Sequence, residues 1–251
     1  MKKALLLISL CSIMLYAAPT ACPKFYVEGE APTIINEKLA SKTKELCFEA
    51  FVVMHSGVAK TPLWSAEYLT ATAIDADIPR KNKFHEETRL PINERAQIND
   101  YAKSGYDRGH MSPSADMPTE SAQADSFSLA NMVPQDHNNN TGIWSSIESA
   151  TRYLAKKEGS LYIITGPIFK GDIRAIGNGV LIPTMIYKII YSPKQQKAAA
   201  YLTNNAPPGR EYQVISIKEL EALTGISFFP KMSEEKKAQL LSLPEPKEMK
   251  H

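Results

Sequence analysis

The spacing of five short runs of β-branched, aromatic and other apolar residues constrains the fold most strongly. These runs cover residues 48–55, 64–69, 161–165, 183–191 and 198–203. Runs of this length and composition predict strands, and turn residues such as Ser56-Gly57 and Ser192-Pro193 follow two of them. Helical patterns at 142–155 and 217–223 occur without the regular strand–helix alternation of a parallel sheet. We therefore predict an α+β fold with a mainly antiparallel sheet core.

The N-terminal residues differ in composition from the rest of the chain. Lys2 and Lys3 precede an apolar run over 4–18, which small residues and Pro19 follow. This order is typical of a secretory signal peptide, and the run is shorter than the roughly 20 residues that span a bilayer. We predict a signal peptide over residues 1–21, with cleavage at about 17–21. The prediction implies an exported protein, periplasmic or secreted, without stable membrane association after cleavage.

Removal of the leader changes the cysteine and charge counts. The remaining chain keeps Cys22 and Cys47, and an even pair in an oxidising compartment favours a disulfide, with two free thiols as the alternative. Lys2 and Lys3 are two of the 29 basic residues, so the remaining chain carries 27 basic against 27 acidic residues. Nucleic-acid-binding proteins usually show excess positive charge. Any phosphate-binding surface must therefore be a local patch.

The run Asp107-Arg108-Gly109-His110 lies in a polar, irregular part of the chain. His110 is a candidate general base because imidazole titrates close to working pH. Arg108 suits a phosphate contact because its planar fork donates hydrogen bonds in pairs. We interpret Gly109 as a sharp turn and Asp107 as a structural residue. Alone, the run is equally compatible with a surface loop that carries an Asp–Arg ion pair.

A second polar group precedes and enters the predicted helix at 142–155. Amide oxygens of the asparagines at 138–140 are hard neutral ligands, which suit a Mg²⁺ ion that keeps several waters. Glu148 and Arg152 are four residues apart and share one helix face. Taken separately, these residues are better explained as an Asn-rich helix cap and an ordinary ion pair. Their convergence with His110 between residues 107 and 152 predicts a site for phosphodiester hydrolysis.

Taken together, the motifs resemble those of a known family. Asp107-Arg108-Gly109-His110, Asn131-x-x-Pro134-Gln135, Asn140-x-Gly142-x-Trp144 and Glu148 are similar to the DNA/RNA non-specific endonuclease family. The active site of that family is a ββα-metal, or His-Me, finger. The resemblance covers roughly residues 48–230, and no linker divides the chain after the leader. We therefore expect one endonuclease domain over 22–251, with its core at about 48–230.

The resemblance implies a metal site as well as a base. His110 matches the general base that activates water. Asn140 matches the single direct protein ligand of a hydrated Mg²⁺ or Mn²⁺ ion, and Glu148 matches the residue that holds metal-bound water. The register among Asn138, Asn139 and Asn140 stays open. His137 is a departure, because nothing in the family pattern requires a histidine there, and we expect a core role or a phosphate contact.

The remaining site residues are also implied by the resemblance. Arg108 and Arg152 match positions that contact phosphate, and Arg80 matches an upstream arginine through a looser pattern. Asn131 matches a residue that supports the site by orienting the histidine or the water.

The expected function is an exported, metal-dependent endonuclease that cuts DNA and also RNA without sequence specificity, leaving 5′-phosphate ends. One alternative is a DNA-selective nuclease of the same fold. Others are a catalytically inactive nucleic-acid-binding protein and a phosphodiesterase that acts on small nucleotides. Whether the protein forms a homodimer stays open.

Overall fold

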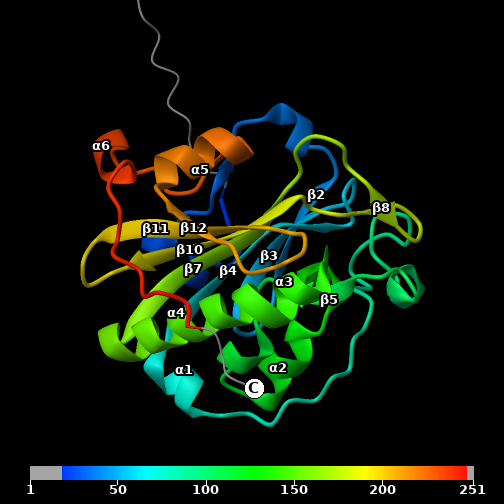
Figure 1. The fold of residues 1–251 in the computed structure, drawn as a ribbon, viewed down its shortest axis with the longest axis horizontal. Coiled ribbons are helices and arrows are strands. Elements are labelled where there is room, and N and C mark those ends of the chain that lie inside the picture. The colour runs from blue at the N-terminus through cyan, green and yellow to red at the C-terminus, as the bar shows by residue number, and fades with distance from the viewer. Residues whose placement is uncertain (1–18, 248–251) are drawn as a thin grey trace, which may run out of the picture.

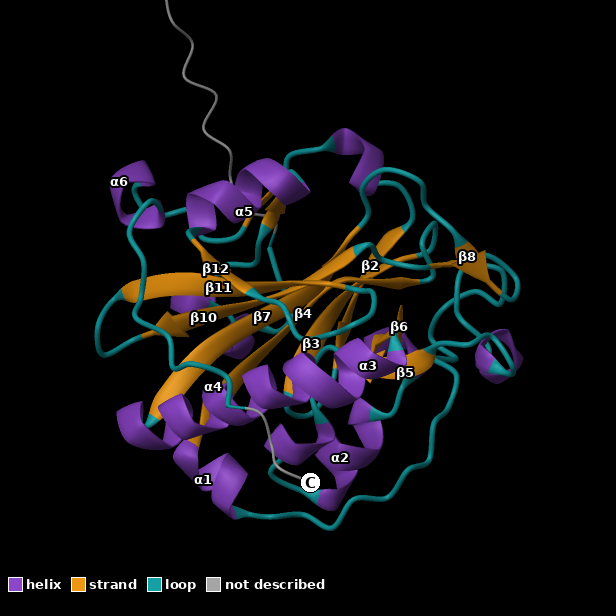
Figure 2. Ribbon diagram, viewed as in Figure 1, coloured by secondary structure: helices purple, strands orange, loops and turns teal. Residues whose placement is uncertain are grey.

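The computed structural model describes residues 19–247, and its centre is a seven-stranded sheet (Figures 1 and 2). The strand order is β12-β11-β10-β7-β4-β3-β2, and every neighbouring pair is antiparallel. The strands are β2 (Thr43–Cys47), β3 (Phe51–Ser56), β4 (Thr61–Thr70), β7 (Ser160–Ile168), β10 (Met185–Ser192), β11 (Lys197–Asn204) and β12 (Gln213–Ile215). The predicted α+β class with a mainly antiparallel sheet is confirmed. Most of the predicted signal peptide, residues 1–18, lies outside the described residues.

The strand predictions differ from the structure mainly at one edge of the sheet. The run predicted over 48–55 begins as β3 at Phe51, and β4 begins at Thr61, three residues before the run predicted over 64–69. Strand β2 was not predicted. Leu46 is its only buried residue, because β2 lies at the sheet edge and presents lysine and glutamate side chains. Charged side chains are common on edge strands, where they discourage pairing with other chains, and they hide the strand from a hydrophobicity pattern.

Helices cover both faces of the sheet (Figures 1 and 2). Helices α1 (Ala71–Asp75) and α4 (Ser145–Glu158) lie on one side, and α5 (Ile217–Thr224) and α6 (Glu234–Lys237) lie on the other. Because successive side chains of a strand point to opposite faces of the sheet, β7 contributes residues to the cores on both faces. Ile163 belongs to the same core cluster as Ile147 of α4, whereas Ile164 belongs to the cluster that contains Leu220 of α5. Within residues 19–247, no helix has the length and apolar content needed to cross a bilayer.

A separate β-hairpin and α4 form the ββα unit that the sequence predicts. Strand β5 (Asp107–His110) pairs antiparallel with β6 (Met132–Gln135), and α2 (Glu120–Ser126) lies in the connection between them. The chain then forms α3 (His137–Asn139), a π-helical turn over Asn140–Trp144, and α4. Two further small sheets pair β1 (Thr33–Ile34) with β13 (Ile226–Ser227) and β8 (Ala175–Ile176) with β9 (Val180–Leu181).

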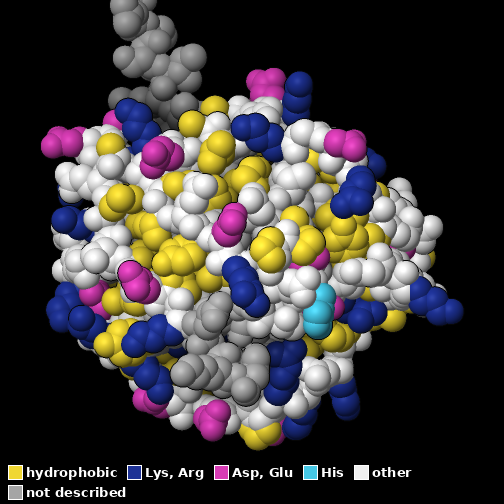
Figure 3. Space-filling model, viewed as in Figure 1, with side chains coloured by type: hydrophobic (Ala, Val, Ile, Leu, Met, Phe, Trp, Pro, Cys, Tyr) yellow, Lys and Arg dark blue, Asp and Glu magenta, His cyan; other side chains and the backbone are white. Residues whose placement is uncertain are grey.

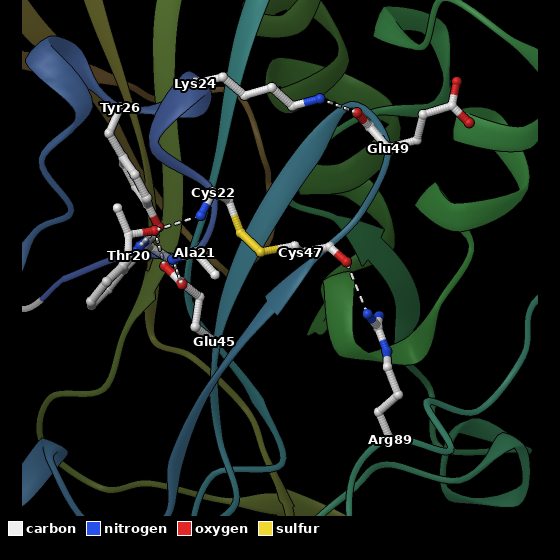
Figure 4. Close-up of a disulfide and its surroundings, with 10 residues drawn as sticks. Thr20, Ala21, Cys22, Lys24, Tyr26, Glu45, Cys47, Glu49 and Arg89 are labelled. Atoms are coloured by element: carbon white, nitrogen blue, oxygen red, sulfur yellow. Dashed lines mark hydrogen bonds between the residues drawn. A yellow bond between two sulfur atoms is a disulfide. The ribbon is translucent and has the colours of Figure 1, made fainter.

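The predicted disulfide between Cys22 and Cys47 is present and joins the N-terminal segment to the edge strand β2 (Figure 4). The two Cα atoms are 5.9 Å apart. Beside the bridge, Glu45 accepts hydrogen bonds from Thr20 Oγ1 (2.6 Å) and from the Ala21 amide (2.9 Å). Arg89 Nη1 donates to the Cys47 carbonyl over 2.9 Å. The covalent link and these polar contacts hold the segment against the sheet edge.

We predict that the double variant Cys22→Ser/Cys47→Ser unfolds more easily than the wild type. The bridge closes a loop with a sequence separation of 25. Loss of a constraint of this length destabilises a protein by on the order of 3 kcal/mol. Urea unfolding followed by circular dichroism measures the difference. Reduced wild type is the control and should match the variant; a wild type whose unfolding does not respond to reduction would contradict the prediction.

Candidate active site

A cavity of about 350 Å³ lies between β5 and the start of α4. Five of the residues that the sequence singled out line it: Arg80, Arg108, His110, Asn140 and Glu148. Residues 113–115, 141 and 145 complete the wall. The fold therefore brings an imidazole, an amide, a carboxylate and two guanidinium groups into one space, although Arg80 and Glu148 are far apart in sequence.

His110 is held at the end of β5 with its ring almost fully buried. The Phe127 ring meets it edge-on at a centroid distance of 5.0 Å. Within the described part of the chain, the buried Nε2 atom has no hydrogen-bond partner. Burial lowers the pKa of His110 to about 3, and the positive charge of Arg80 adds to the effect. The imidazole is therefore neutral at physiological pH, which is the form that a general base needs.

Gly109 is required by close packing and not by a turn. It lies in β5 opposite Val133, with Gln135 of β6 packed beside it. A Cβ atom at Gly109 would lie 2.7 Å from the Cβ atom of Gln135, closer than side chains tolerate. The turn that the sequence suggested at this position is thus wrong, because the whole run 107–110 is a strand.

The three consecutive asparagines occupy different environments. Asn138 is exposed. Asn139 is buried, and its side chain accepts a hydrogen bond from Gln135 Nε2 (2.7 Å) and donates to the Asn204 carbonyl (2.8 Å). Asn140 is the one that lines the cavity, and its Nδ2 atom donates to Asp107 Oδ2 over 2.9 Å. With Nδ2 held by Asp107, the Asn140 Oδ1 atom is left for another partner.

The turn that carries Asn140 is fastened to the chain that follows β11. The Asp136 amide donates to Asn205 Oδ1 over 2.8 Å, and the Ile143 amide donates to the Gly209 carbonyl over 3.0 Å. A Cβ atom at Gly209, where φ is +68°, would lie 2.4 Å from the backbone of Asn138. Only glycine fits between these two backbone segments at this φ.

The oxygen donors of the cavity fit a hydrated divalent cation. Asn140 offers an amide oxygen and Glu148 a carboxylate, which are hard ligands of the kind that Mg²⁺ prefers. One carboxylate and one amide are too few for a complete protein cage, and Mg²⁺ typically keeps several waters. Among residues 19–247, the one cluster of three potential ligands from Cys, His, Asp and Glu is Cys22, Glu45 and Cys47. Its sulfur atoms form the disulfide, so it is not a metal site.

Two arginines of the cavity rest on an aromatic cluster formed by Phe84, Tyr101 and Phe127. The Arg108 guanidinium lies 5.0 Å from the Phe84 ring centre and 5.2 Å from that of Tyr101. The Arg80 guanidinium lies 5.3 Å from the Phe127 ring centre. Cation–π contacts of this kind hold a guanidinium in place without occupying all of its N–H donors. The aromatic cluster was not predicted from the sequence, since isolated aromatic residues in an irregular segment carry no pattern.

Asn131 and Arg152 do not line the cavity. Asn131 is fully buried, and its amide bonds both the N–H (3.0 Å) and the carbonyl (2.8 Å) of Ser112. It therefore braces the chain directly after His110. Arg152 Nη1 donates to the buried Asp116 carboxylate over 3.1 Å, and its Nη2 donates to Ser149. The predicted phosphate contact of Arg152 stays a prediction, since it would require the guanidinium to leave this ion pair.

A cluster of charged residues lies close to Glu148 and comprises Glu67, Asp116, Arg152 and Lys188, of which all but Arg152 are buried. Burial raises the pKa of Glu148, and the charges of Arg152 and Lys188 oppose the rise. Lys188 Nζ donates to Thr165 Oγ1 over 2.8 Å and approaches the Met111 carbonyl at 3.5 Å. Lys188 was not predicted from the sequence to lie close to the site. A lysine in the middle of an otherwise apolar strand was the available signal, because such a residue is costly to bury without a partner.

Basic side chains do not gather into one large patch on the face shown in Figure 3. Lysine and arginine side chains are interspersed there with acidic ones, in line with the near balance of charge in the sequence. The guanidinium groups that could contact phosphate are the local pair in the cavity, Arg80 and Arg108.

Comparison with known proteins identifies a family match across most of the chain. The sequence model described as DNA/RNA non-specific endonuclease matches residues 30–235. The chain is 32% identical over 214 residues to a protein of Danio rerio named Nuclease EXOG, mitochondrial, covering 76% of this chain and 62% of that protein. It is 32% identical over 221 residues to the Mitochondrial nuclease of Saccharomyces cerevisiae, covering 76% of this chain and 67% of that protein.

A solved structure of an EndoG/EndoGI complex has a similar fold. One of its chains aligns with a TM-score of 0.71 and 26% identity, covering 76% of this chain and 88% of that chain. The match agrees with the ββα arrangement of β5, β6 and α4 described above. The chain spans less than two thirds of the length of the zebrafish relative.

The predicted location is contradicted by these comparisons. The zebrafish and yeast relatives are both named as mitochondrial nucleases, whereas the leader composition predicted a periplasmic or secreted protein. The prediction of an exported protein is therefore wrong. A basic and apolar leader is recognised by a targeting receptor. Its composition alone therefore does not identify the compartment.

We predict that Phe84→Leu lowers kcat/KM for nucleic acid about tenfold while the protein stays folded. The substitution keeps an apolar side chain but removes the ring beneath Arg108 and beside His110, and one such contact contributes on the order of 1 kcal/mol. Cleavage kinetics and thermal unfolding measure the two effects.

Phe48→Leu is the matched control for this prediction. The Phe48 ring also lies beneath an arginine, Arg89, at 4.4 Å, but Arg89, unlike Arg108, does not line the cavity. Phe48→Leu should leave kcat/KM unchanged. Equal losses of kcat/KM in the two variants would show that the aromatic cluster has no specific effect on the cavity.

Proposed function

Because this chain belongs to the DNA/RNA non-specific endonuclease family, a family of hydrolases, we propose that it is a divalent-metal-dependent endonuclease. Its proposed substrates are DNA and RNA, cut without sequence specificity to leave 5′-phosphate ends. The family is generally dependent on a divalent metal ion. The observation that carries the proposal is the convergence of His110, Asn140, Glu148 and two arginines on one cavity.

In this proposal His110 accepts a proton from the attacking water. The imidazole is neutral at physiological pH, and only the neutral form can accept a proton. The packing of Phe127 against the ring and the bracing of Ser112 by Asn131 restrict the movement of the base. Restriction of this kind lowers the activation free energy of cleavage, because a group that is already in place loses less entropy in the transition state.

Arg80 and Arg108 would bind the phosphate that is attacked. Both line the cavity with His110, and both rest on rings that leave N–H donors free. Positive groups fixed in advance stabilise the charge that grows on the phosphate oxygens in the transition state. Neither arginine is held by a carboxylate among the ion pairs of residues 19–247, in contrast to Arg152.

Asn140 and Glu148 would hold the divalent ion, proposed as Mg²⁺ or Mn²⁺, with Asn140 as the direct ligand and Glu148 acting through water. Such an ion supplies Lewis-acid stabilisation of the phosphate and of the leaving oxygen. Asp107 holds the Asn140 amide through Nδ2, so the amide oxygen can serve as the ligand. The π-helical turn over Asn140–Trp144 presents this side chain at the entrance to α4.

Two other functions make different predictions. A DNA-selective nuclease of the same fold would cut plasmid and single-stranded DNA but spare RNA. A catalytically inactive nucleic-acid-binding protein would bind these polymers without cutting them. The complete set of base, metal-binding oxygens and phosphate-binding arginines in one cavity favours an enzyme over a binding protein.

We predict that His110→Ala loses cleavage by a factor of about 10²–10⁴, the usual cost of removing a general base. The assay incubates the full chain and the variant with supercoiled plasmid, single-stranded DNA and RNA, with Mg²⁺ or with EDTA. The wild type should cut all three polymers with Mg²⁺ and none with EDTA. Cleavage that persists in EDTA, or an unimpaired variant, would refute the mechanism.

We predict that Asn140→Ala raises the Mg²⁺ concentration required for half-maximal cleavage by at least about tenfold, because it removes the direct ligand. Titration of the cleavage rate with Mg²⁺ measures the change. Asn138→Ala is the control, since Asn138 is exposed and does not line the cavity. If Asn138→Ala shows the larger shift, the metal ligand has been assigned to the wrong asparagine.

A further inference from the structure

We propose that His137 is a positioning residue for the metal ligand Asn140 and that it acts through Asp107. The inference rests on the proposed function, since it concerns the ligand of the divalent ion. From the sequence, we expect a core role or a phosphate contact for His137. The structure instead places this side chain on the surface, with 69% of it exposed.

The geometry that carries the inference is a shared acceptor. Asp107 Oδ2 lies 2.9 Å from His137 Nδ1 and 2.9 Å from Asn140 Nδ2. One carboxylate oxygen of β5 thus receives a donor from α3 and a donor from the following turn. The three side chains form a short chain of contacts that runs from the surface to the cavity, where Asn140 is the member that lines it.

The orientation of the Asn140 amide depends on this acceptor. An amide presents an oxygen on one side and an NH₂ group on the other, and only the oxygen can bind a cation. A carboxylate at Nδ2 selects the orientation in which Oδ1 is free. The Asp107 side chain is itself 32% exposed, so without a second contact it is free to adopt other rotamers that turn away from Asn140.

His137 supplies the second contact to Asp107, and hydrogen bonds hold its backbone in place. It begins α3, and the Asp136 side chain caps this turn by accepting the amides of Asn138 (3.0 Å) and Asn139 (3.1 Å). Thr141 Oγ1 also donates to the His137 carbonyl over 2.8 Å. The histidine backbone is therefore anchored at both its own turn and the next. Partners of a metal ligand that orient it in this way typically change metal affinity by about 10- to 100-fold when removed.

The experiment measures Mn²⁺ binding directly at pH 7.5, from the electron paramagnetic resonance signal of free Mn²⁺, in the full chain without nucleic acid. We expect His137→Leu to weaken binding about tenfold. His137→Asn should stay within about twofold of the wild type, because the asparagine amide can donate from nearly the position of Nδ1. Cleavage at saturating Mg²⁺ should be nearly normal in both variants, since neither removes the base or the direct ligand.

Two further variants separate the possible failures. Asn138→Leu places the same leucine on the adjacent exposed position and should bind Mn²⁺ like the wild type. Asn140→Ala should abolish the site; if it binds Mn²⁺ normally, the proposed metal site itself is wrong. If Asn140→Ala loses binding but His137→Leu does not, the inference about His137 is overturned. Equal weakening in His137→Leu and His137→Asn would also overturn it, because the hydrogen bond would then not be the cause.

Discussion

The antiparallel pairing of β5 with β6 is the constraint on which the rest of the site depends. The ladder places His110 opposite Met132 and Asp107 opposite Gln135, so residues distant in sequence become neighbours. The chain leaves β6 at Gln135, and the helical turn that begins at His137 brings Asn140 back to Asp107. A change in register of one residue would turn each of these side chains to the other face of the hairpin.

Burial gives the site its chemical properties at the cost of desolvating polar groups. His110 is neutral because its surroundings disfavour a charge, and the same burial raises the pKa of Glu148. Buried polar groups are tolerated when partners satisfy them, as Asn131 does for Ser112 and Lys188 for Thr165. The proposed base, the proposed metal-binding oxygens and the two arginines of the cavity are thus held in place before any substrate arrives, which is the arrangement that electrostatic catalysis requires.

Much of the fold was predictable because its signals are local. The strand at 161–165, the helix that becomes α4 and the cysteine pair all follow from composition and spacing. The predicted helix at 142–155 was observed at Ser145–Glu158, since a π-helical turn occupies its expected start and Gly159, at a φ of 93°, ends it. Edge strand β2 was not predictable, because its charged side chains conceal its pairing with β3. The compartment was predicted wrongly, because the composition of a leader alone does not identify the compartment.

The sequence by itself determined which chemistry the chain carries: a histidine, amides, a carboxylate and arginines in motifs specific enough to indicate one family. Only the tertiary structure decided which of these groups meet. It brought Arg80 to His110, turned Arg152 toward Asp116, and singled out Asn140 from its two neighbours. The physical reason is that motifs follow the order of the chain, whereas contacts depend on strand register and on the packing of helices against the sheet. The contacts of His137 with Asp107, of Phe84 with Arg108 and of Lys188 with Thr165 likewise arise only in the tertiary structure.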